Sequence, residues 1–234
     1  MKTELTSKLI SRFDRLSGRR QNWETHWQEV ADYMLPRKAD ITKKRSRGDK
    51  RMERIFDSSP LQALELLASS LHGMMTNPAT PWFTLRFKKL EDSNDDEAKL
   101  WLEEATEVMY TAFNRSNFQQ EIFELYHDLI TFGTAAMFVE EDEQDLIKFS
   151  TRHIDEVYVA ENQKGRIDTI FRRFHMTARA LVQKFGDNVS QDVKLMATKN
   201  PYEEIDIIHA VYPRNDFNPK KQDKKNMPFE SIYF

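Results

Sequence analysis

The stretch Asp57–Leu85 opens with Asp57 and Ser58 and continues over residues 59–85 as SPLQALELLASSLHGMMTNPATPWFTL. It joins a well-capped helix to a tight loop and an aromatic run. Asp57 or Ser58 can cap the helix, and Pro60 suits its first turn, where the missing N–H costs nothing. The dipeptide Asn77-Pro78 stops the helix. Apolar residues at helical spacing form the expected buried face: Leu61, Leu64, Leu67, Ala68, Leu71 and Met75.

The end of this stretch is expected to be a strand. Pro81 leads into residues 82–87, which read WFTLRF and have the aromatic content typical of strands. His72 has no second metal ligand nearby in the sequence. We therefore interpret His72 as a structural or capping residue.

Residues 4–35, upstream of this stretch, are expected to form one long helix that Pro36 ends. Gly18 is a point where this helix can break or kink. Arg20 fills a position at which the apolar stripe has no apolar residue. We interpret Trp23 and Trp27 first as core packing and second as a seam with a partner helix. The stripe consists of Leu9, Phe13, Leu16, Trp23, Trp27, Val30 and Met34.

Residues 37–54 differ from the rest of the chain in charge. Nine cations stand against Asp40, Asp49 and Glu53, with few apolar residues, which is typical of a mobile loop. One interpretation is a solvated loop, and the other is contact with nucleic-acid phosphates or an acidic partner. The residues assigned to such a contact are Lys43, Lys44, Arg45, Arg47, Lys50 and Arg51.

Two further helices are expected next, over about residues 95–114 and from residue 118 to Gly133, which suits a C-terminal cap. Asn94 can cap the first, and Ser116 or Asn117 the second. A short connection suggests that the two form an antiparallel pair. The expected buried faces are Trp101, Ala105, Val108, Met109 and Ala112 in the first helix, and Phe118, Ile122, Leu125, Leu129 and Phe132 in the second.

From residue 134 the apolar period becomes two, which predicts strands. Expected strand pairs are 135–140 with 146–151 and 154–160 with 167–174, the second pair turning at Gly165. Short helices follow over 178–185, capped by Thr177, and 189–198, and further strands over 204–212 and 229–234. The last strand has no partner after it, so we expect the sequence to be a fragment of a longer protein.

The expected fold class is α+β, with long N-terminal helices followed by antiparallel strands and short helices. Its expected segments are an N-terminal helical arm (1–36), a basic loop (37–56), a helical core (57–133) and a β-rich part (134–234) that is incomplete at its C-terminus.

Composition excludes several classes of protein. The net charge of −3 gives no bulk basic charge for nucleic-acid binding, so any such role must be local. The absence of cysteine excludes disulfides, thiolate metal sites and a cysteine nucleophile. No apolar run approaches the roughly 20 residues of a membrane span, and the N-terminus lacks a signal sequence. We expect a protein of the cytosol, or of an assembly made there.

No catalytic or cofactor-binding pattern stands out. The sequence has no Gly-rich phosphate loop, HExxH or GxSxG motif. Its six histidines include no pair at three- or four-residue spacing, so metal ligation is not expected. The carboxylates of Glu103-Glu104 and residues 140–145 are interpreted as a solvated helix face and an acidic turn. We expect no cofactor, no metal and no enzymatic activity.

Seven segments, in order along nearly the whole chain, together resemble the bacteriophage head-to-tail connecting proteins, which are the portal proteins of short-tailed phages. The segments are residues 23–27 (WETHW) with 31–36 (ADYMLP); 56–58 (FDS) with Ala63 and 67–69 (LAS); 81–83 (PWF); 116–118 (SNF); 129–136 (LITFGTAA); 172–178 (RRFHMTA) with Phe185-Gly186; and 208–214 (IHAVYPR).

This resemblance implies a subunit of a homo-oligomeric ring, typically of twelve copies, at one vertex of the virion capsid. Double-stranded DNA would be driven in through its channel by terminase and would leave toward the tail. The other implied partners are the scaffolding and major capsid proteins and a tail adaptor, met during assembly in the host cytoplasm. The chain resembles the family's wing and N-terminal arm, truncated before the stem and clip. No catalytic residue carries over, because the family has none.

Two alternatives to a ring subunit stay open from the residues alone. One is a nucleic-acid-binding module that uses the basic loop 37–54. The other is a hydrolytic enzyme with an unmarked carboxylate site. For the ring subunit, we expect the helices over 4–35 and 60–75 to take part in subunit contacts. The aromatic residues expected there are Trp23, Trp27, Trp82 and Phe83.

Overall fold

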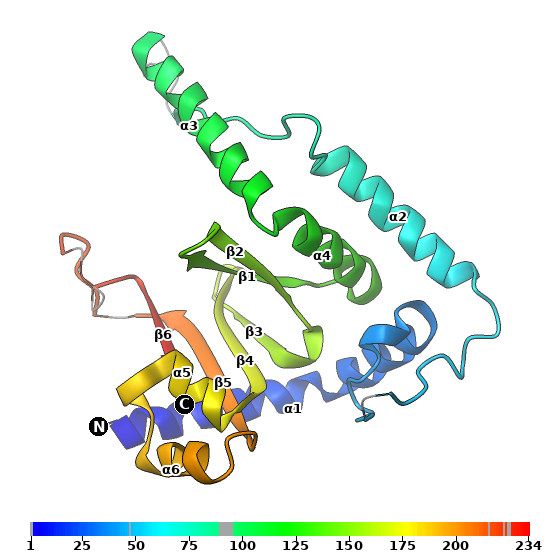
Figure 1. Cartoon of the computed structure of the whole chain (residues 1–234), viewed down its shortest axis with the longest axis vertical. Coiled ribbons are helices and arrows are strands. Elements are labelled where there is room, and N and C mark those ends of the chain that lie inside the picture. The colour runs from blue at the N-terminus through cyan, green and yellow to red at the C-terminus, as the bar shows by residue number, and fades with distance from the viewer. Residues whose placement is uncertain (1, 47, 89–95, 215, 222, 224–225) are drawn as a thin grey trace. The chain divides into compact units, whose positions relative to one another are not determined.

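The computed structural model describes residues 2–46, 48–88, 96–214, 216–221, 223 and 226–234 (Figure 1). It mixes helices with antiparallel sheets, so the predicted α+β class is confirmed. The chain divides into two compact units, one made of residues 1–21 and 156–234 and the other of residues 22–155. Each unit therefore has its own core and is described separately.

The long helix α1 (Lys2–Met34) contributes its first part to one unit and its second part to the other. It matches the prediction for 4–35 closely. The helix runs through Gly18 without interruption, so no break occurs there. Leu35 and Pro36 end it, and Pro36 opens the 3-10 turn η1 (Pro36–Lys38).

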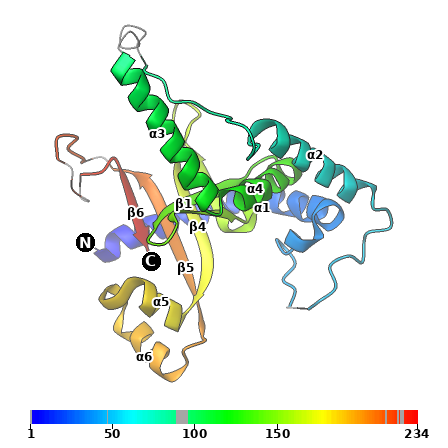
Figure 2. The same cartoon turned by 45° about the horizontal axis from the view of Figure 1, so that its top comes forward.

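The unit made of residues 1–21 and 156–234 contains a four-stranded antiparallel sheet in the order β3-β4-β5-β6. Figure 2 shows β4, β5 and β6 of this sheet side by side. Short helices pack together in the connection between β4 and β5. The bounds are β3 Val157–Glu161, β4 Ile167–Thr177, α5 Ala178–Phe185, η4 Gly186–Asn188, α6 Gln191–Lys199, β5 Glu204–Pro213 and β6 Phe229–Tyr233. Most expected elements are confirmed, including the cap of α5, where Thr177 Oγ1 accepts from Ala180 N at 3.3 Å.

The last strand, β6, has a partner within the chain. It pairs antiparallel with β5, with Val211 opposite Ser231. The absence of a later partner strand therefore does not leave residues 229–234 unpaired, because their partner precedes them in the chain.

The core of this unit lies between α1 and the sheet. Leu9 and Phe13 of α1 pack on Tyr158, Phe171 and Ala210, with the Phe13 and Tyr158 rings 4.7 Å apart. The three strand residues of this core are neighbours in the sheet, because Phe171 lies opposite Tyr158 on β3 and opposite Ala210 on β5.

Arg20 continues the same side of α1 and shows how a cation fills a position in an apolar stripe. Its guanidinium donates to the Val157 carbonyl and lies 3.6 Å from the centroid of the Tyr158 ring. A buried cation needs such partners, because an unpaired charge in the interior costs several kcal/mol (about 3–5).

The unit of residues 22–155 is built mainly from helices. Its helix α4 packs chiefly against α2 and also contacts β2. The expected antiparallel pairing of the helices at 95–114 and 118–133 is therefore wrong, although Gly133 does cap α4 with φ 72°. The bounds are α2 Ser59–Met75, α3 Asp96–Arg115, α4 Phe118–Phe132, β1 Ala136–Asp142 and β2 Leu146–Arg152, followed by the turn η3 Ile154–Glu156.

The core of this unit gathers residues from α1, the basic loop, α2 and α4. Its buried members are Ala31, Leu35, Ala39, Ile41, Leu64, Phe132 and Ile154, with Trp27 packed against them. His72 is structural as expected, because its Nε2 lies 2.8 Å from Gln119 Oε1 on α4.

Residues 82–87 form no strand, contrary to the prediction. Tyr110 and Thr106 of α3 hold this extended segment instead. The Tyr110 hydroxyl accepts from Trp82 N and Phe83 N at 2.6 Å each, and donates to Phe83 O at 2.9 Å. The aromatic side chains of this segment pack against other rings. The Trp82 and Phe118 rings are stacked, with their centroids 5.7 Å apart. Side-chain hydroxyls thus replace the neighbouring strand that a sheet would need.

The buried faces predicted for α2 and α3 are only partly buried. In α2, Leu64 and Ala68 are buried but Leu67 and Met75 are exposed. In α3, Trp101 and Val108 are 62% and 68% exposed. Leu102, Thr106, Tyr110 and Phe113 lie on the side of α3 that meets the rest of the unit. The predicted cap Asn94 lies outside the described residues.

Candidate interaction site at the basic loop

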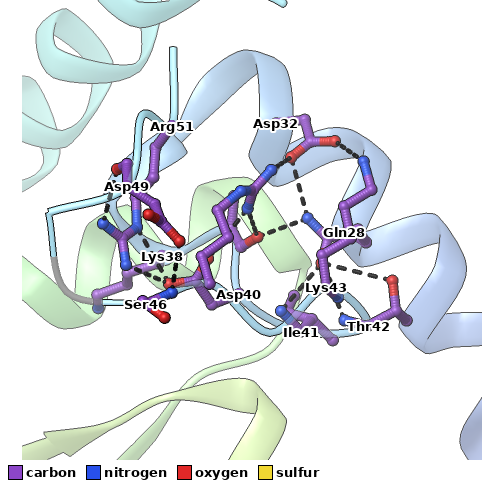
Figure 3. A network of polar contacts seen from close by, with 12 residues as sticks. Gln28, Asp32, Lys38, Asp40, Ile41, Thr42, Lys43, Ser46, Asp49 and Arg51 are labelled. Atoms are coloured by element: carbon purple, nitrogen blue, oxygen red, sulfur yellow. Dashed lines mark hydrogen bonds and ion pairs between the residues drawn. The ribbon is translucent and has the colours of Figure 1, made fainter. Parts of the chain in front are cut away.

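The basic loop is anchored by Gln28, a buried residue of α1 (Figure 3). The Gln28 amide oxygen accepts from three successive backbone N–H groups, those of Ile41 (3.0 Å), Thr42 (2.9 Å) and Lys43 (3.2 Å). Its amide nitrogen donates to Ala39 O at 2.6 Å. One side chain therefore supplies the hydrogen bonds that a loop without regular structure cannot make internally.

One helical turn further, Asp32 is 1% exposed and collects three cations. Its carboxylate lies 2.9 Å from Lys43 Nζ, 3.2 Å from Arg45 Nη2 and 3.3 Å from Arg54 Nη1. Burial alone would raise the pKa of Asp32, but hydrogen bonds from Lys43, Arg45 and Gln28 outweigh burial and lower it. The carboxylate is thus held charged among its partners.

Asp40, within the loop, is the second acceptor. Arg51 donates to it from Nη2 at 2.6 Å and Nε at 3.0 Å, and Arg45 Nη1 lies 3.0 Å away. Burial opposes ionisation, but these hydrogen bonds lower the pKa of Asp40. Arg45 bridges Asp40 and Asp32, and its hydrogen bond to Asp40 raises its pKa. The two carboxylates and their arginines form one network.

The start of the loop is attached to α4. Lys38 Nζ lies 2.6 Å from Asp128 Oδ1 and 3.4 Å from Glu124 Oε2. Burial raises the pKa of Asp128, and the charge of Lys38 opposes that rise. The Lys38 carbonyl also accepts a hydrogen bond from His153 Nε2 at 2.8 Å, so both the side chain and the backbone of Lys38 are held.

The predicted contact residues are therefore not equivalent. Lys43, Arg45 and Arg51 contact the carboxylates of Asp32 and Asp40 at 2.6–3.2 Å. Lys44 is exposed and has a long contact of 3.9 Å to Asp155, and Lys50 is exposed as well. Arg47 lies outside the described residues. The structure differs from the expected mobile loop over residues 39–45, because buried acceptors on α1 fix this part. No role was predicted for Gln28 and Asp32 from the sequence. Two polar residues four positions apart beside an apolar stripe are the sequence signal that could have identified them.

A groove of about 800 Å³ lies beside the loop in the same unit. Apolar side chains predominate in its lining, which includes Leu35, Met52, Leu61 and Leu66, and Arg51 and Glu65 supply charge there. Such a groove suits an apolar side chain of another protein segment.

The aromatic residues expected at subunit contacts take no part in the polar network of the loop. Trp23 is exposed, with its ring 6.1 Å from that of Trp27, which packs on the core. Trp82 and Phe83 belong to the aromatic cluster around Tyr110 and Phe118. Their role in subunit contacts stays a prediction.

Two other kinds of site are absent from the described parts of the chain. No group of three or more histidine, aspartate or glutamate residues there is arranged to hold a metal ion. None of the helices described is both long enough and apolar enough to cross a membrane.

Comparison with known proteins connects the chain to phage connectors. The sequence model of the family described as "Bacteriophage head to tail connecting protein" matches residues 6–234. The probable portal protein of Bordetella phage BPP-1 is 34% identical over 229 residues, which are 97% of this chain and 41% of that protein. The portal protein of Salmonella phage epsilon15 is 36% identical over 230 residues, with the same two shares. The chain thus spans about two fifths of the length of these relatives.

Proposed function

The chain belongs to the bacteriophage head to tail connecting protein family, and from this membership we propose that it is the wing part of a portal subunit. In this proposal, copies of the complete protein form a ring at one vertex of the capsid, and phage DNA enters and leaves through the channel of the ring. The proposal gives the chain a structural role, with no catalytic residue and no cofactor.

The observation that carries the proposal is the exposed side of α2. Glu65 is the one carboxylate of α2, and the exposed residues away from it carry no charge, although charged residues make up 31% of the chain. Leu66 is 71% exposed and Met74 is 84% exposed. The members of this α2 face are Ala63, Leu66, Leu67, Ser70, Gly73 and Met74. A surface helix normally carries its charges on this side, and their depletion is typical of subunit interfaces.

A second apolar surface in the same unit supports the proposal. Trp101 and Val108 of α3 lie on the helix side that the apolar period predicted as buried, yet both are exposed. Periodicity shows that a face is apolar and does not tell which chain covers it. A second copy of the protein is the occupant that we propose for both faces.

The finer parts of the proposal follow from the family resemblance. They are a ring of twelve copies, assembly in the host cytoplasm and a final place at the portal vertex of the virion. The proposed partners are terminase, scaffolding and major capsid proteins, and a tail adaptor.

Charged substitutions on the α2 face test the interface. We expect Leu66→Lys with Met74→Lys, made in the complete gene product, to shift the oligomer to smaller species, because two buried ammonium groups would lack partners. Mass photometry over a concentration series measures the shift. Because both positions are exposed in the single chain, the free energy of unfolding should change by only about 0.5 kcal/mol per site.

The matched control is Leu195→Lys on α6, which also places a lysine at an exposed apolar position. We expect it to leave the oligomer unchanged. Identical oligomers from the wild type and the double α2 variant would rule out the α2 face as an interface.

A further inference from the structure

A line of four cations runs along the first part of α1. Lys8, Arg12, Arg15 and Arg19 follow one another at spacings of four, three and four residues, which places them on one side of the helix. All four are exposed, and they lie on a different side from Phe13, which packs on the sheet. With a rise of 1.5 Å per residue, this cationic stripe is about 16 Å long.

These cations are only weakly neutralised by the unit that carries them. Lys8 Nζ lies 2.9 Å from Glu4 in an exposed pair, and such pairs contribute little. Arg12 Nη2 donates to the neutral hydroxyl of Thr169 at 2.8 Å. Arg15 and Arg19 have no ion pair among the residues that the structure describes. The basic loop is the opposite case, because the buried Asp32 and the half-buried Asp40 take up its arginines.

A shallow hollow of about 450 Å³ lies along the stripe. Its lining holds three of the cations and two hydroxyl groups, and neither a carboxylate nor an apolar side chain: Ser7, Lys8, Ser11, Arg12 and Arg15. Guanidinium, ammonium and hydroxyl groups are the donors that phosphate oxygens accept from in proteins.

Carboxylates also lie beside the Lys8 and Arg12 end of the stripe. A neighbouring hollow shares Lys8 and Arg12 with it and includes Asp168, Asp216 and Glu230. Glu230 is already engaged, because Tyr212 donates to it at 3.0 Å and Arg214 lies 3.5 Å away. Arg15 and Arg19 are therefore the part of the stripe most available to an anion.

We propose that this stripe binds the phosphate backbone of double-stranded DNA without regard to base sequence. DNA carries one negative charge per about 1.7 Å of its axis, so a straight line of cations can meet several phosphates at once. A protein partner would need an apolar contact centre, which the lining lacks. This DNA contact does not depend on the ring proposed above, since the chain alone carries every residue of the stripe.

The test measures binding of the 234-residue chain to a fluorescent DNA duplex by anisotropy, between about 50 and 200 mM salt. Each phosphate contact contributes about 0.9 to the slope of log affinity against log salt. We expect Arg15→Gln with Arg19→Gln to lower that slope by about 1.8, and Arg19→Gln alone by about 0.9. Arg15→Lys with Arg19→Lys keeps the charge and should keep the slope.

The matched control removes two exposed cations from the basic loop, Lys44→Gln with Lys50→Gln, and changes net charge equally. We expect it to leave the slope unchanged. Absence of binding by the wild type, or the same loss from stripe and loop variants, would overturn the proposal. Stripe-dependent binding of polyglutamate in place of DNA would also overturn it and assign the stripe to an acidic protein.

Discussion

Replacing Asp32 with alanine is expected to lower the free energy of unfolding of the 22–155 unit by about 3 kcal/mol. The Asp32 carboxylate is buried and receives Lys43, Arg45 and Arg54, so its loss leaves Arg45 partly buried with one carboxylate fewer. Urea denaturation followed by tryptophan fluorescence measures the effect. All four tryptophans lie within this unit, so their emission reports chiefly on it.

Glu103→Ala provides the control, because Glu103 is exposed on α3 and its loss should cost only about 0.5 kcal/mol or less. Equal stabilities of the Asp32 and Glu103 variants would contradict the network's role in stability.

The measurement on Asp32 also has an expected pH dependence. Because the folded state lowers the pKa of Asp32 below its ordinary value of 3.8, its stabilising effect is present above that value. The effect is lost as pH falls through the lower, folded-state pKa. The difference between wild type and Asp32→Asn should therefore shrink in acid.

Replacing Phe171 with alanine is expected to destabilise the sheet-containing unit by about 3–5 kcal/mol. Phe171 is fully buried at 0% exposure, in the cluster with Leu9, Phe13 and Tyr158. The truncation removes a large apolar side chain and leaves a cavity. Hydrogen exchange of the β4 and β5 amides is the suitable measurement, because this unit has no tryptophan.

Ile170→Ala is the matched control on the same strand. Ile170 is exposed on the other face of the sheet, so its truncation should accelerate exchange far less. If the β4 and β5 amides exchanged at the same rate in both variants, the packing of α1 on the sheet would not depend on Phe171.

Local signals were enough to predict most elements of the fold. The apolar stripe of residues 4–35, the cap at Thr177 and the glycine at residue 133 each act within a few residues, and the structure has them where expected. The prediction of a strand over residues 82–87 was wrong for the opposite reason. A strand exists only if another strand pairs with it, and here Tyr110 and Thr106 made the bonds instead.

The candidate site could be predicted only in part. The charge of the basic loop is visible in composition, but its neutralisation depends on Gln28 and Asp32, which precede it on a different element. The face of α3 shows the same limit, because an apolar period does not identify the surface that covers it. The cationic stripe was overlooked in the sequence because the apolar stripe of the same helix gives the stronger pattern.

The central claim, that this chain is part of a ring-forming portal subunit, is tested most directly by imaging the complete gene product. Negative-stain electron microscopy, with mass in solution measured on the same sample, is the decisive measurement. The account predicts rings with a central hole and a mass of many subunits. A complete protein that stays monomeric at high concentration would contradict it.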